Sequence, residues 1–294
     1  MPLFSVVIPA YNRKEMLLRA IESVLSQDFT DFELSVIDDG STDGTDSIED
    51  IYRGRLRYIF QPNSGVSSAR NRGILASSSP WIALLDSDDT WHKSKLRRHM
   101  EYLKNNTSVL IHQTEDIWIR NGSRVNPGKK HVKKEGDLFN DSLKLCMISP
   151  SSVVFSREVT EKYGLFDEAL PACEDYDLWL RITPFEYIGL IREKLITRYA
   201  GHSDQLSSTN PLMDRFRLYS IIKLLINSRD KLKKGQIEEA EKTAIEKARI
   251  LLAGSLKRGC SGNVSILEGV ISSLEHGFYT KTECQTLLQL QIHP

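Results

Sequence analysis

The first hundred residues alternate between continuous apolar runs and segments in which apolar residues recur every three or four positions. The runs are rich in β-branched residues and predict buried strands, whereas the recurrent spacing predicts amphipathic helices. The predicted strands cover residues 4–8, 32–37, 56–60 and 81–85. The predicted helices begin after Asn12, which can cap the first, and at about residues 66 and 93. This alternation, with short connections, indicates an α/β fold with a mainly parallel, Rossmann-like sheet flanked by helices.

The middle of the chain is less regular, and its end is helical. An amphipathic helix is predicted at 173–183, and further strands are predicted at 109–120, 151–155 and 186–199. After about residue 210 no strand pattern remains, and helical patterns follow at 218–225, 237–253 and 264–274. The chain is therefore expected to contain an α/β domain over residues 1–208 and a C-terminal α-helical extension over residues 209–294.

The composition is that of a globular protein, with 40% hydrophobic and 27% charged residues among 294. Lysine plus arginine and aspartate plus glutamate both total 39, so no overall field favours nucleic acid and no such partner is expected. The four cysteines form no CxxC pair, which disfavours a structural zinc site and a disulfide framework. No apolar run approaches the roughly 20 residues that cross a bilayer. A cytoplasmic protein is expected. The alternative is peripheral contact with the inner face of the membrane, through the basic loop 121–136 or the tail. The sequence does not indicate an oligomeric state.

Polar clusters follow three of the predicted strands. They occupy residues 11–13, 38–43 and 86–89. In a parallel sheet the carboxyl ends of the strands meet at one edge, and ligands bind there. Three segments that are far apart in the sequence are thus expected to form one site.

Asp86 and Asp88, two positions apart at the end of a predicted strand, are the candidate metal ligands. Carboxylates crowded together repel one another unless a cation lies among them, and Mg²⁺ and Mn²⁺ favour carboxylate and phosphate oxygens. One or two carboxylates, completed by phosphate oxygens and water, would hold such an ion beside a diphosphate. For an isolated motif of this kind a solvated turn that caps the next helix is the favoured alternative. The buried strand before it and the two other clusters favour the metal.

The second cluster supplies candidate contacts to a nucleotide. Asp38 and Asp39 end the second strand, and a carboxylate there can accept a hydrogen bond from a pyrimidine N–H. Tyr11 can provide an aromatic face for the base, and Arg70 can approach the base or the diphosphate. The structural alternatives are that Asp39 builds a turn and that Arg70 forms a surface salt bridge.

Glu174 and Asp175 open the amphipathic helix and are the candidate catalytic carboxylates. A transfer to a hydroxyl group needs a general base that takes the proton from that hydroxyl; Asp175 is the first choice and Glu174 the second. The alternative is that carboxylates are favoured electrostatically at a helix N-terminus. His202 follows the last predicted strand and is a candidate ligand of the metal or the diphosphate, with a polar surface residue as an equal alternative.

Five segments together resemble the inverting glycosyltransferases of family 2, which have the GT-A fold. They are spread over about residues 3–208 and follow the order of the family: Val6–Arg13, Ile37–Thr45, Gly65–Gly73, Leu85–Asp89 and Glu174–Arg181. The resemblance implies a nucleotide-diphospho-sugar donor, often linked to UDP, inversion at the anomeric carbon, and Mn²⁺ or Mg²⁺. It implies that Tyr11 and Asp39 bind the base, that Asp88 binds the metal, and that Asp175 is the general base. The other residues expected at the donor lie in the same segments: Pro9, Arg13, Asp38, Arg70 and Asp86.

The sequence lacks the QxxRW motif and the membrane helices of processive synthases in this family, so a single addition is expected. By resemblance, the acceptor is expected to be a glycan of a surface polysaccharide or a lipid-linked glycan. Two other classes stay open. A sugar-phosphate nucleotidyltransferase has a similar sheet, but it would be expected to carry a Gly-rich loop where Pro9–Arg13 stands here. A non-catalytic nucleotide-sugar-binding protein is disfavoured because every carboxylate that catalysis needs is retained.

Overall fold

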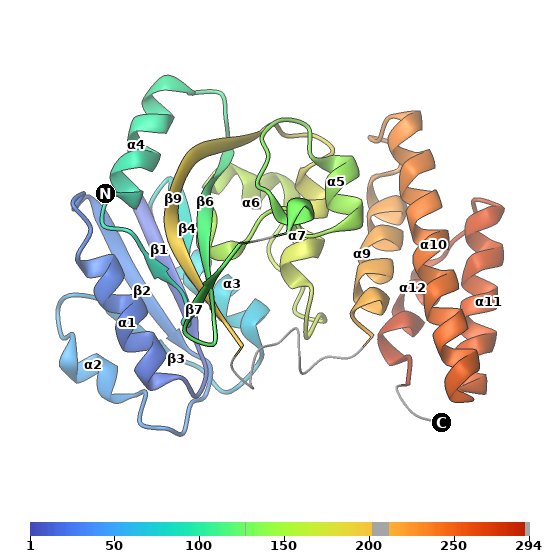
Figure 1. The fold of residues 1–294 in the computed structure, drawn as a ribbon, viewed down its shortest axis with the longest axis horizontal. Coiled ribbons are helices and arrows are strands. Elements are labelled where there is room, and N and C mark those ends of the chain that lie inside the picture. Colours follow the sequence, from blue (N-terminus) through green and yellow to red (C-terminus); the bar gives the residue numbers. More distant parts are fainter. Residues whose placement is uncertain (127, 202–211, 292–294) are drawn as a thin grey trace. The chain divides into compact units, whose positions relative to one another are not determined.

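The computed structural model describes residues 1–126, 128–201 and 212–291, and the chain divides into two compact units (Figure 1). Unit 1 contains the sheet and consists of Met1–Asp137, Met147–Pro171 and Phe185–His202. Unit 2 consists of Leu138–Cys146, Ala172–Pro184 and Ser203–Pro294. The domain boundary predicted between residues 208 and 209 falls outside the described residues and stays a prediction.

The sheet of unit 1 has nine strands among the described residues, in the order β3-β2-β1-β4-β8-β6-β9-β5, with β7 beside β6. The first four strands of this order are parallel to one another. Their bounds are β1 (Phe4–Ala10), β2 (Phe32–Asp38), β3 (Arg57–Phe60) and β4 (Trp81–Leu84). The four strands predicted for this part of the chain are therefore confirmed, and β1 is buried along its whole length.

Beyond β4 the pairing is mixed. β8 (Val153–Ser156) is antiparallel to both β4 and β6 (Ile111–Arg120), and β9 (Ile188–Ala200) is parallel to β6. The short strands β5 (Thr90–Trp91) and β7 (Ser123–Val125) are antiparallel to β9 and β6. Two antiparallel steps restore the original direction, so β6 runs the same way as β4 and ends at the same edge of the sheet.

Helices of unit 1 pack against this sheet through their apolar faces. Their bounds are α1 (Lys14–Leu25), α2 (Ser47–Ile51), α3 (Val66–Ala76), α4 (Lys95–Asn105) and α6 (Arg157–Tyr163), with 3₁₀ turns η1 (Lys129–His131) and η2 (Pro150–Ser152). α1 buries Leu17, Ile21 and Val24 in a core shared with β1 and β2. A methyl group on Gly73 of α3 would lie 2.3 Å from a side-chain carbon of Val7 on β1. Glycine at this position therefore allows α3 to approach the sheet closely.

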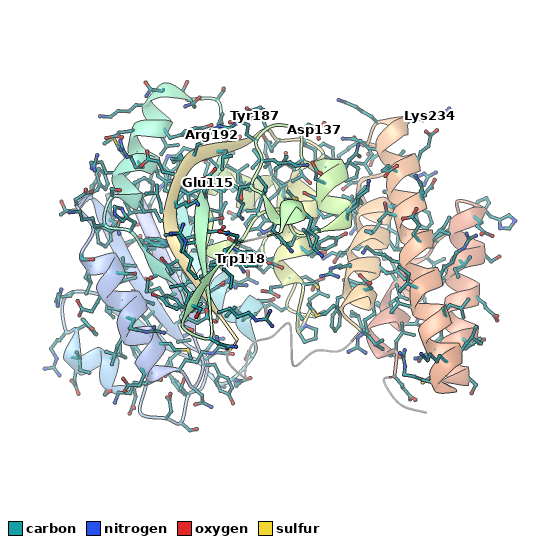
Figure 2. All side chains as sticks on the ribbon, in the orientation of Figure 1. Glu115, Trp118, Asp137, Tyr187, Arg192 and Lys234 are labelled. Atoms are coloured by element: carbon teal, nitrogen blue, oxygen red, sulfur yellow. The ribbon has the colours of Figure 1, made fainter. Side chains whose placement is uncertain are left out.

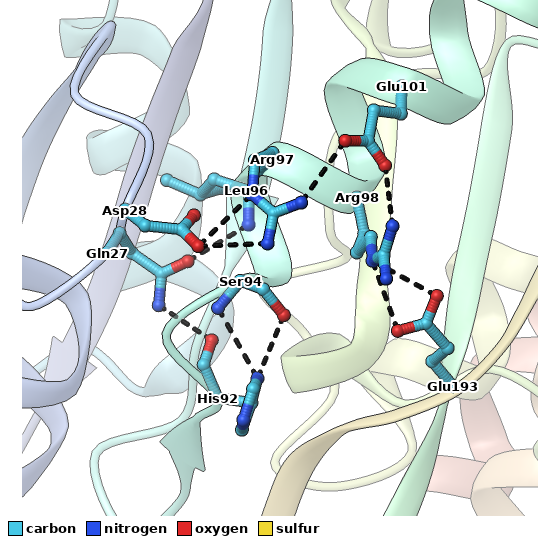
Figure 3. A network of polar contacts seen from close by, with 9 residues as sticks. All are labelled: Gln27, Asp28, His92, Ser94, Leu96, Arg97, Arg98, Glu101 and Glu193. Carbon is cyan, nitrogen blue, oxygen red and sulfur yellow. Dashed lines mark hydrogen bonds and ion pairs between the residues drawn. The ribbon is translucent and has the colours of Figure 1, made fainter.

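Polar contacts fix the start of α4, the helix that follows the third polar cluster (Figure 3). The side chain of Gln27, just after α1, donates to the carbonyl of His92 at 2.9 Å. The same side chain accepts from the N–H of Leu96 at 3.0 Å. Arg97 forms an ion pair with Asp28 at 3.0 Å. These contacts join the beginning of α4 to the end of α1.

A cluster of basic side chains is buried between α4 and β6. Lys95 and His99 on α4 and His112 on β6 are fully buried, and Lys95 Nζ lies 2.7 Å from His99 Nε2 and 4.6 Å from the centroid of the Trp91 ring. His112 stacks on Tyr102 with 4.8 Å between ring centroids, and neither ring nitrogen of His112 has a hydrogen-bond partner among the described residues. Burial disfavours the charged forms and lowers the pKa of all three groups, that of His112 to about 3.

Unit 2 contains helices and no strand among its described residues. Their bounds are α5 (Phe139–Lys144), α7 (Glu174–Ile182), α9 (Met213–Ser228), α10 (Lys234–Arg258), α11 (Ser261–Glu275) and α12 (Lys281–Thr286), followed by η3 (Leu287–Gln289). The predicted helix at 173–183 and the three helical patterns of the tail are confirmed. α5 and α7 pack against each other. α5 also packs against α10, and α7 also packs against α9. Within the described parts of the chain, every helix is too short or too polar to span a membrane.

Candidate active site

The three polar clusters predicted from the sequence lie at the carboxyl ends of β2, β1 and β4, which are neighbours in the sheet. The first two are joined directly. Asn12 Oδ1 accepts from the N–H of Thr42 at 2.7 Å, and the N–H of Asn12 donates to Ser41 Oγ at 2.9 Å. Asn12 has a φ of 50°, and the N-cap of α1 is Arg13. The expectation that Asn12 caps this helix is therefore wrong, because its side chain bonds to the neighbouring cluster instead.

Asp38 is buried, and both of its oxygens are engaged within the protein. Oδ1 accepts from the N–H of Ser41 at 2.8 Å, and Oδ2 accepts from the Tyr58 hydroxyl. Burial, together with this hydrogen bond, raises the pKa of Tyr58. These contacts fix the turn after β2, and a contact of Asp38 with a nucleotide stays a prediction.

Asp39 is only 3% exposed and organises the loop before α3. Its oxygens accept from Gln61 Nε2 at 2.7 Å and from the N–H groups of Ser64 and Gly65 at 2.9 and 2.8 Å. α3 begins after Gly65 without a side-chain cap, so Asp39 satisfies backbone donors near the helix start from another segment. This supports the turn-building role considered as an alternative, and the contact with a nucleotide base stays a prediction.

Arg70 on α3 is buried and forms an ion pair with the partly exposed Asp86 after β4. Arg70 Nη2 lies 2.7 Å from Asp86 Oδ1, and the Arg70 side chain is 4% exposed. Its guanidinium lies 5.2 Å from the centroid of the Phe166 ring. The N–H of Asp86 donates to Ser151 Oγ at 3.1 Å. The alternative that Arg70 forms a surface salt bridge is therefore wrong, since α3 holds it against the end of the sheet.

Arg13 and Asp88 link the first cluster to the third. Arg13 Nη1 lies 3.1 Å from Asp88 Oδ2, and both side chains are largely buried. Tyr11, in contrast, is 48% exposed, which leaves its ring accessible after β1. Pro9 lies within β1, where it pairs with Ile37 of β2. Hydrogen bonds and ion pairs thus connect the three clusters within unit 1.

Asp86 and Asp88 offer two hard oxygen donors to a divalent cation. Among the residues described, no group of three or more His, Cys, Asp or Glu side chains that could hold a metal ion is formed. An ion at this position would need further oxygens from another molecule, such as phosphate, to complete its coordination. The donor set of the described residues therefore fits a cation that binds together with an anionic ligand.

Asp89 has a structural role that the sequence did not reveal. It is 5% exposed; its Oδ2 accepts from Ser151 Oγ at 2.7 Å, and its Oδ1 accepts from the N–H of Tyr199 at 3.1 Å. Burial and the neighbouring Asp88 raise the pKa of Asp89, whereas Arg198 opposes the shift. Asp89 thus joins the end of β4 to η2 and to the end of β9.

A further group of polar and aromatic side chains lies on the carboxyl-terminal halves of β6 and β9. The Arg198 guanidinium lies 5.1 Å from the centroid of the Trp118 ring, and Arg198 Nη1 lies 4.0 Å from Asp116 Oδ2. Trp118, labelled in Figure 2, also contacts His131 with 5.3 Å between ring centroids. Asp116 Oδ2 and Trp118 Nε1 have no hydrogen-bond partner among the described residues. The one available sequence signal was the polar composition of residues 112–116, which is unusual for an interior strand.

The candidate catalytic carboxylates open α7 in unit 2. Glu174 is 5% exposed. Asp175 Oδ2 accepts from Cys146 Sγ at 3.3 Å, and Asp175 Oδ1 accepts from the N–H of Tyr176 at 2.7 Å. Burial, together with the charge of Asp175, raises the pKa of the Cys173 thiol to about 12, so this thiol stays protonated. No sequence pattern links Cys146 to Asp175, which are brought together by the packing of unit 2.

The predicted convergence of site residues is found within unit 1. Asp39 and Asp88 belong to the clusters that follow β2 and β4, the two strands that flank β1 in the sheet. Asp175 belongs to unit 2. That Asp175 shares one pocket with Asp39 and Asp88 stays a prediction. His202 lies outside the described residues, so its role as a ligand also stays a prediction.

Comparisons with known proteins concern the family and the fold of the chain. The family model described as glycosyl transferase family 2 matches residues 5–164. A Rickettsia felis protein named as an uncharacterized glycosyltransferase is 32% identical over 219 residues, which are 71% of this chain and 34% of that protein. The chain thus spans about a third of that relative's length. The putative teichuronic acid biosynthesis glycosyltransferase TuaG of Bacillus subtilis is 27% identical over 212 residues, which are 70% of this chain and 82% of TuaG.

Two solved structures share the fold. Residues 1–349 of Staphylococcus aureus TarS, in complex with UDP-GlcNAc, match with a TM-score of 0.64 and 18% identity, over 96% of this chain and 93% of that one. The mannosyltransferase PcManGT of Pyrobaculum calidifontis, in complex with GDP-Man and Mn²⁺, matches with a TM-score of 0.57 and 16% identity, over 98% of this chain and 85% of that one. The predicted GT-A fold with a C-terminal helical region is confirmed.

Proposed function

Because the chain belongs to glycosyl transferase family 2, we propose that it is an inverting enzyme that transfers a sugar from a nucleotide-diphospho-sugar, of the UDP type, to an acceptor hydroxyl. One observation carries the proposal: three polar clusters, from the ends of β2, β1 and β4, are bonded into one site. The ion pairs Arg70–Asp86 and Arg13–Asp88 hold its carboxylates in place. Such an edge of an α/β sheet is where nucleotides bind.

The donor nucleotide is assigned to the ends of β1 and β2. The exposed ring of Tyr11 supplies a face on which a base can stack. Asp39 fixes the loop that leads into α3, and its Oδ2, which accepts a hydrogen bond from the N–H of Gly65, has a second lone pair that can accept from a base N–H. Arg13 and Arg70 supply the positive charge that a diphosphate requires.

The divalent ion is assigned to Asp88 and Asp86, with the donor diphosphate completing its coordination. When bound, Mn²⁺ or Mg²⁺ would neutralise the charge of the departing nucleoside diphosphate. The solved complex of PcManGT contains Mn²⁺ together with GDP-Man, which supports a divalent ion for this fold. His202 is retained as a candidate further ligand of the ion or the diphosphate.

Asp175 is assigned as the general base and Glu174 as its neighbour. The acceptor oxygen attacks the anomeric carbon as Asp175 takes the hydroxyl proton, and the bond between that carbon and the diphosphate oxygen breaks. The leaving group departs from the opposite face, which inverts the anomeric centre. The hydrogen bonds from Cys146 and from the N–H of Tyr176 hold the carboxylate in one orientation for this step.

The acceptor is assigned to the class of glycans that form surface polysaccharides or are linked to lipid. The name of TuaG, which refers to teichuronic acid biosynthesis, supports this class. Trp118, Asp116 and Arg198 offer an aromatic ring and hydrogen-bonding groups of the kind that sugars bind. A single addition per encounter, at the cytoplasmic side, remains the proposal for the whole protein.

Release of nucleoside diphosphate tests the proposal. The full chain is incubated with Mn²⁺ and a panel of UDP- and GDP-sugars, with and without a chelator. We expect slow release from one donor class, with water as acceptor, that the chelator stops. Asp175→Asn should lower the rate by about 10²–10⁴-fold while UDP binding, measured by calorimetry, survives. Asp230→Asn, at an exposed position of unit 2, is the matched control.

Three outcomes would contradict parts of this assignment. Near-normal turnover of Asp175→Asn would reject the base. Unchanged Mn²⁺ dependence of donor binding in Asp88→Ala would place the ion elsewhere. Release of pyrophosphate from a nucleoside triphosphate and a sugar phosphate would favour the nucleotidyltransferase, and donor binding without any turnover would favour the binding protein.

A further inference from the structure

The helix that carries the proposed base is built into the C-terminal helices. α7 belongs to the same compact unit as α9 to α12, and it packs against α9 and α5. On the α5 side, the Tyr176 hydroxyl donates to the carbonyl of Leu143 at 2.8 Å. The family model ends at residue 164, so α7 and α9 to α12 lie outside the matched segment, whereas α5 lies within it.

An ion pair with a buried carboxylate connects α7 to α9. Asp177 on α7 is 1% exposed, and Lys223 Nζ on α9 lies 3.0 and 3.1 Å from its two oxygens. Arg181 also reaches Asp177 Oδ2, at 2.9 Å, from the next turn of α7. Because a buried carboxylate is costly without partners, the position of Lys223 and that of α7 are coupled.

Further contacts brace α9 and α10 around α7. Asp214 at the start of α9 pairs with Lys247 on α10 and with Arg217, each at 3.0 Å. Gln236 Nε2, in the first turn of α10, donates to the carbonyl of Pro184, two residues after α7 ends, at 3.1 Å. Lys223 therefore extends from a helix that is itself fixed.

We propose that Lys223 is a positioning residue for sugar transfer, and that through Asp177 it makes the helical extension a working part of the enzyme. The inference rests on the proposed function, because it takes Asp175, two residues before Asp177, as the general base. A displacement of about 1 Å in a reacting group can cost about 100-fold in rate. Loosening α7 should therefore slow the transfer step and leave donor binding at the sheet edge unchanged.

The rival explanation is that this ion pair only adds stability. A purely structural pair would change the melting temperature and the fraction of folded protein, but folded molecules would turn over normally. A positioning pair lowers kcat in folded molecules, spares the KM for the donor, and recovers when another cation replaces the lysine. These readouts separate the two explanations.

The experiment compares Lys223→Met, Lys223→Arg and wild type in the full chain. Nucleoside diphosphate release is measured with Mn²⁺ and the donor that wild type hydrolyses, and far-UV circular dichroism and UDP titration count the folded sites. For Lys223→Met we expect kcat to fall about tenfold or more while the donor KM stays within about twofold. Lys223→Arg should recover most of the rate. Lys234→Met, at a lysine of α10 whose side chain is 91% exposed, is the matched control and should behave as wild type (Figure 2).

If Lys223→Met loses helix content, Lys223→Gln, which keeps a hydrogen-bond donor, replaces it under the same expectation of a reduced kcat and an unchanged KM. Normal kcat in folded Lys223→Met or Lys223→Gln, with Asp175→Asn impaired, overturns the inference and leaves the proposed function standing. A reduction that Lys223→Arg does not recover also overturns it. Absence of release from every donor by wild type, or full activity of Asp175→Asn, is instead a failure of the proposed function.

Discussion

Replacing His112 by phenylalanine should make the protein less sensitive to acid. The imidazole is fully buried, it stacks on Tyr102, and its two nitrogens lack hydrogen-bond partners among the described residues. Phenylalanine keeps a flat ring in the same space and removes the group that titrates. The variant should therefore fold and be at least as stable as wild type at pH 7.

The magnitude follows from the pKa of His112, which burial, reinforced by the charge of Lys95, lowers from 6.5 to about 3. Between pH 6.5 and about 3 the folded state keeps the imidazole neutral, whereas the unfolded state protonates it. The unfolding free energy is therefore unaffected by this group above pH 6.5 and decreases as the pH falls from 6.5 towards 3. Each pH unit in this window costs about 1.36 kcal/mol. Between pH 7 and pH 5, His112 thus removes about 2 kcal/mol of unfolding free energy.

Urea denaturation at pH 7 and pH 5, followed by circular dichroism and tryptophan fluorescence, measures this difference. Wild type should lose about 2 kcal/mol more than His112→Phe between the two pH values. His276→Phe, at an exposed position after α11, is the control and should follow wild type. Equal losses in wild type and His112→Phe would refute the reasoning, because they would show that the folded state accommodates the charged imidazole.

Three further predictions concern other buried contacts. Burial lowers the pKa of Lys95, so the unfolded state binds a proton on this side chain that the folded state does not bind. The unfolding free energy of wild type, measured by urea denaturation, should therefore rise from pH 7 towards pH 10, and Lys95→Met should flatten this rise. Cys146→Ala should lower kcat for nucleoside diphosphate release about two- to tenfold, whereas Cys146→Ser, which keeps a donor for Asp175, should not; equal rates in both would disprove the contact's role. Asp39→Ala leaves three donors unpaired and should lower the unfolding free energy by about 3 kcal/mol, and a loss below about 1 kcal/mol would contradict its bracing role.

The parallel half of the sheet could be predicted from sequence because strands buried on both faces appear as continuous apolar runs. β1 is such a run, and its seven residues are all buried. The carboxyl ends of parallel strands lie at one edge, so the meeting of the clusters after β1, β2 and β4 followed from strand direction alone. The helical tail was predictable for the corresponding reason, since its apolar residues repeat with the helical period.

The mixed half of the sheet could not be predicted in the same way. Nothing in the apolar run of β8 states that it lies antiparallel between β4 and β6, because pairing is decided by packing across the whole sheet. The polar strand β6 was recognised as a strand, but the grouping of Trp118 with Arg198 depends on its register with β9. The packing of α7 against α9 could not be predicted either. An amphipathic pattern indicates that one face of a helix is covered, but it does not indicate which helix covers it.

Side-chain partners were the least predictable part of the site. Asp38 and Asp39 are predicted to contact the nucleotide, and the structure shows that they accept hydrogen bonds from Tyr58, Gln61 and loop N–H groups. A carboxylate after a strand can perform either task, and only three-dimensional neighbours distinguish them. The same holds for Lys223, which looks in sequence like any lysine of an exposed helix face.

The interleaving of the two units along the chain sets an order of events while the protein is being made. α5 and α7 leave the ribosome before α9, α10 and α11, the helices with which they form one body. At about 5–20 residues per second, α7 waits several seconds for those partners. During that interval its apolar face, which includes Trp179, has no native cover from them. A ribosome that stalls before α9 is made therefore carries a nascent chain with exposed apolar surface on α7, and chaperones bind surfaces of this kind.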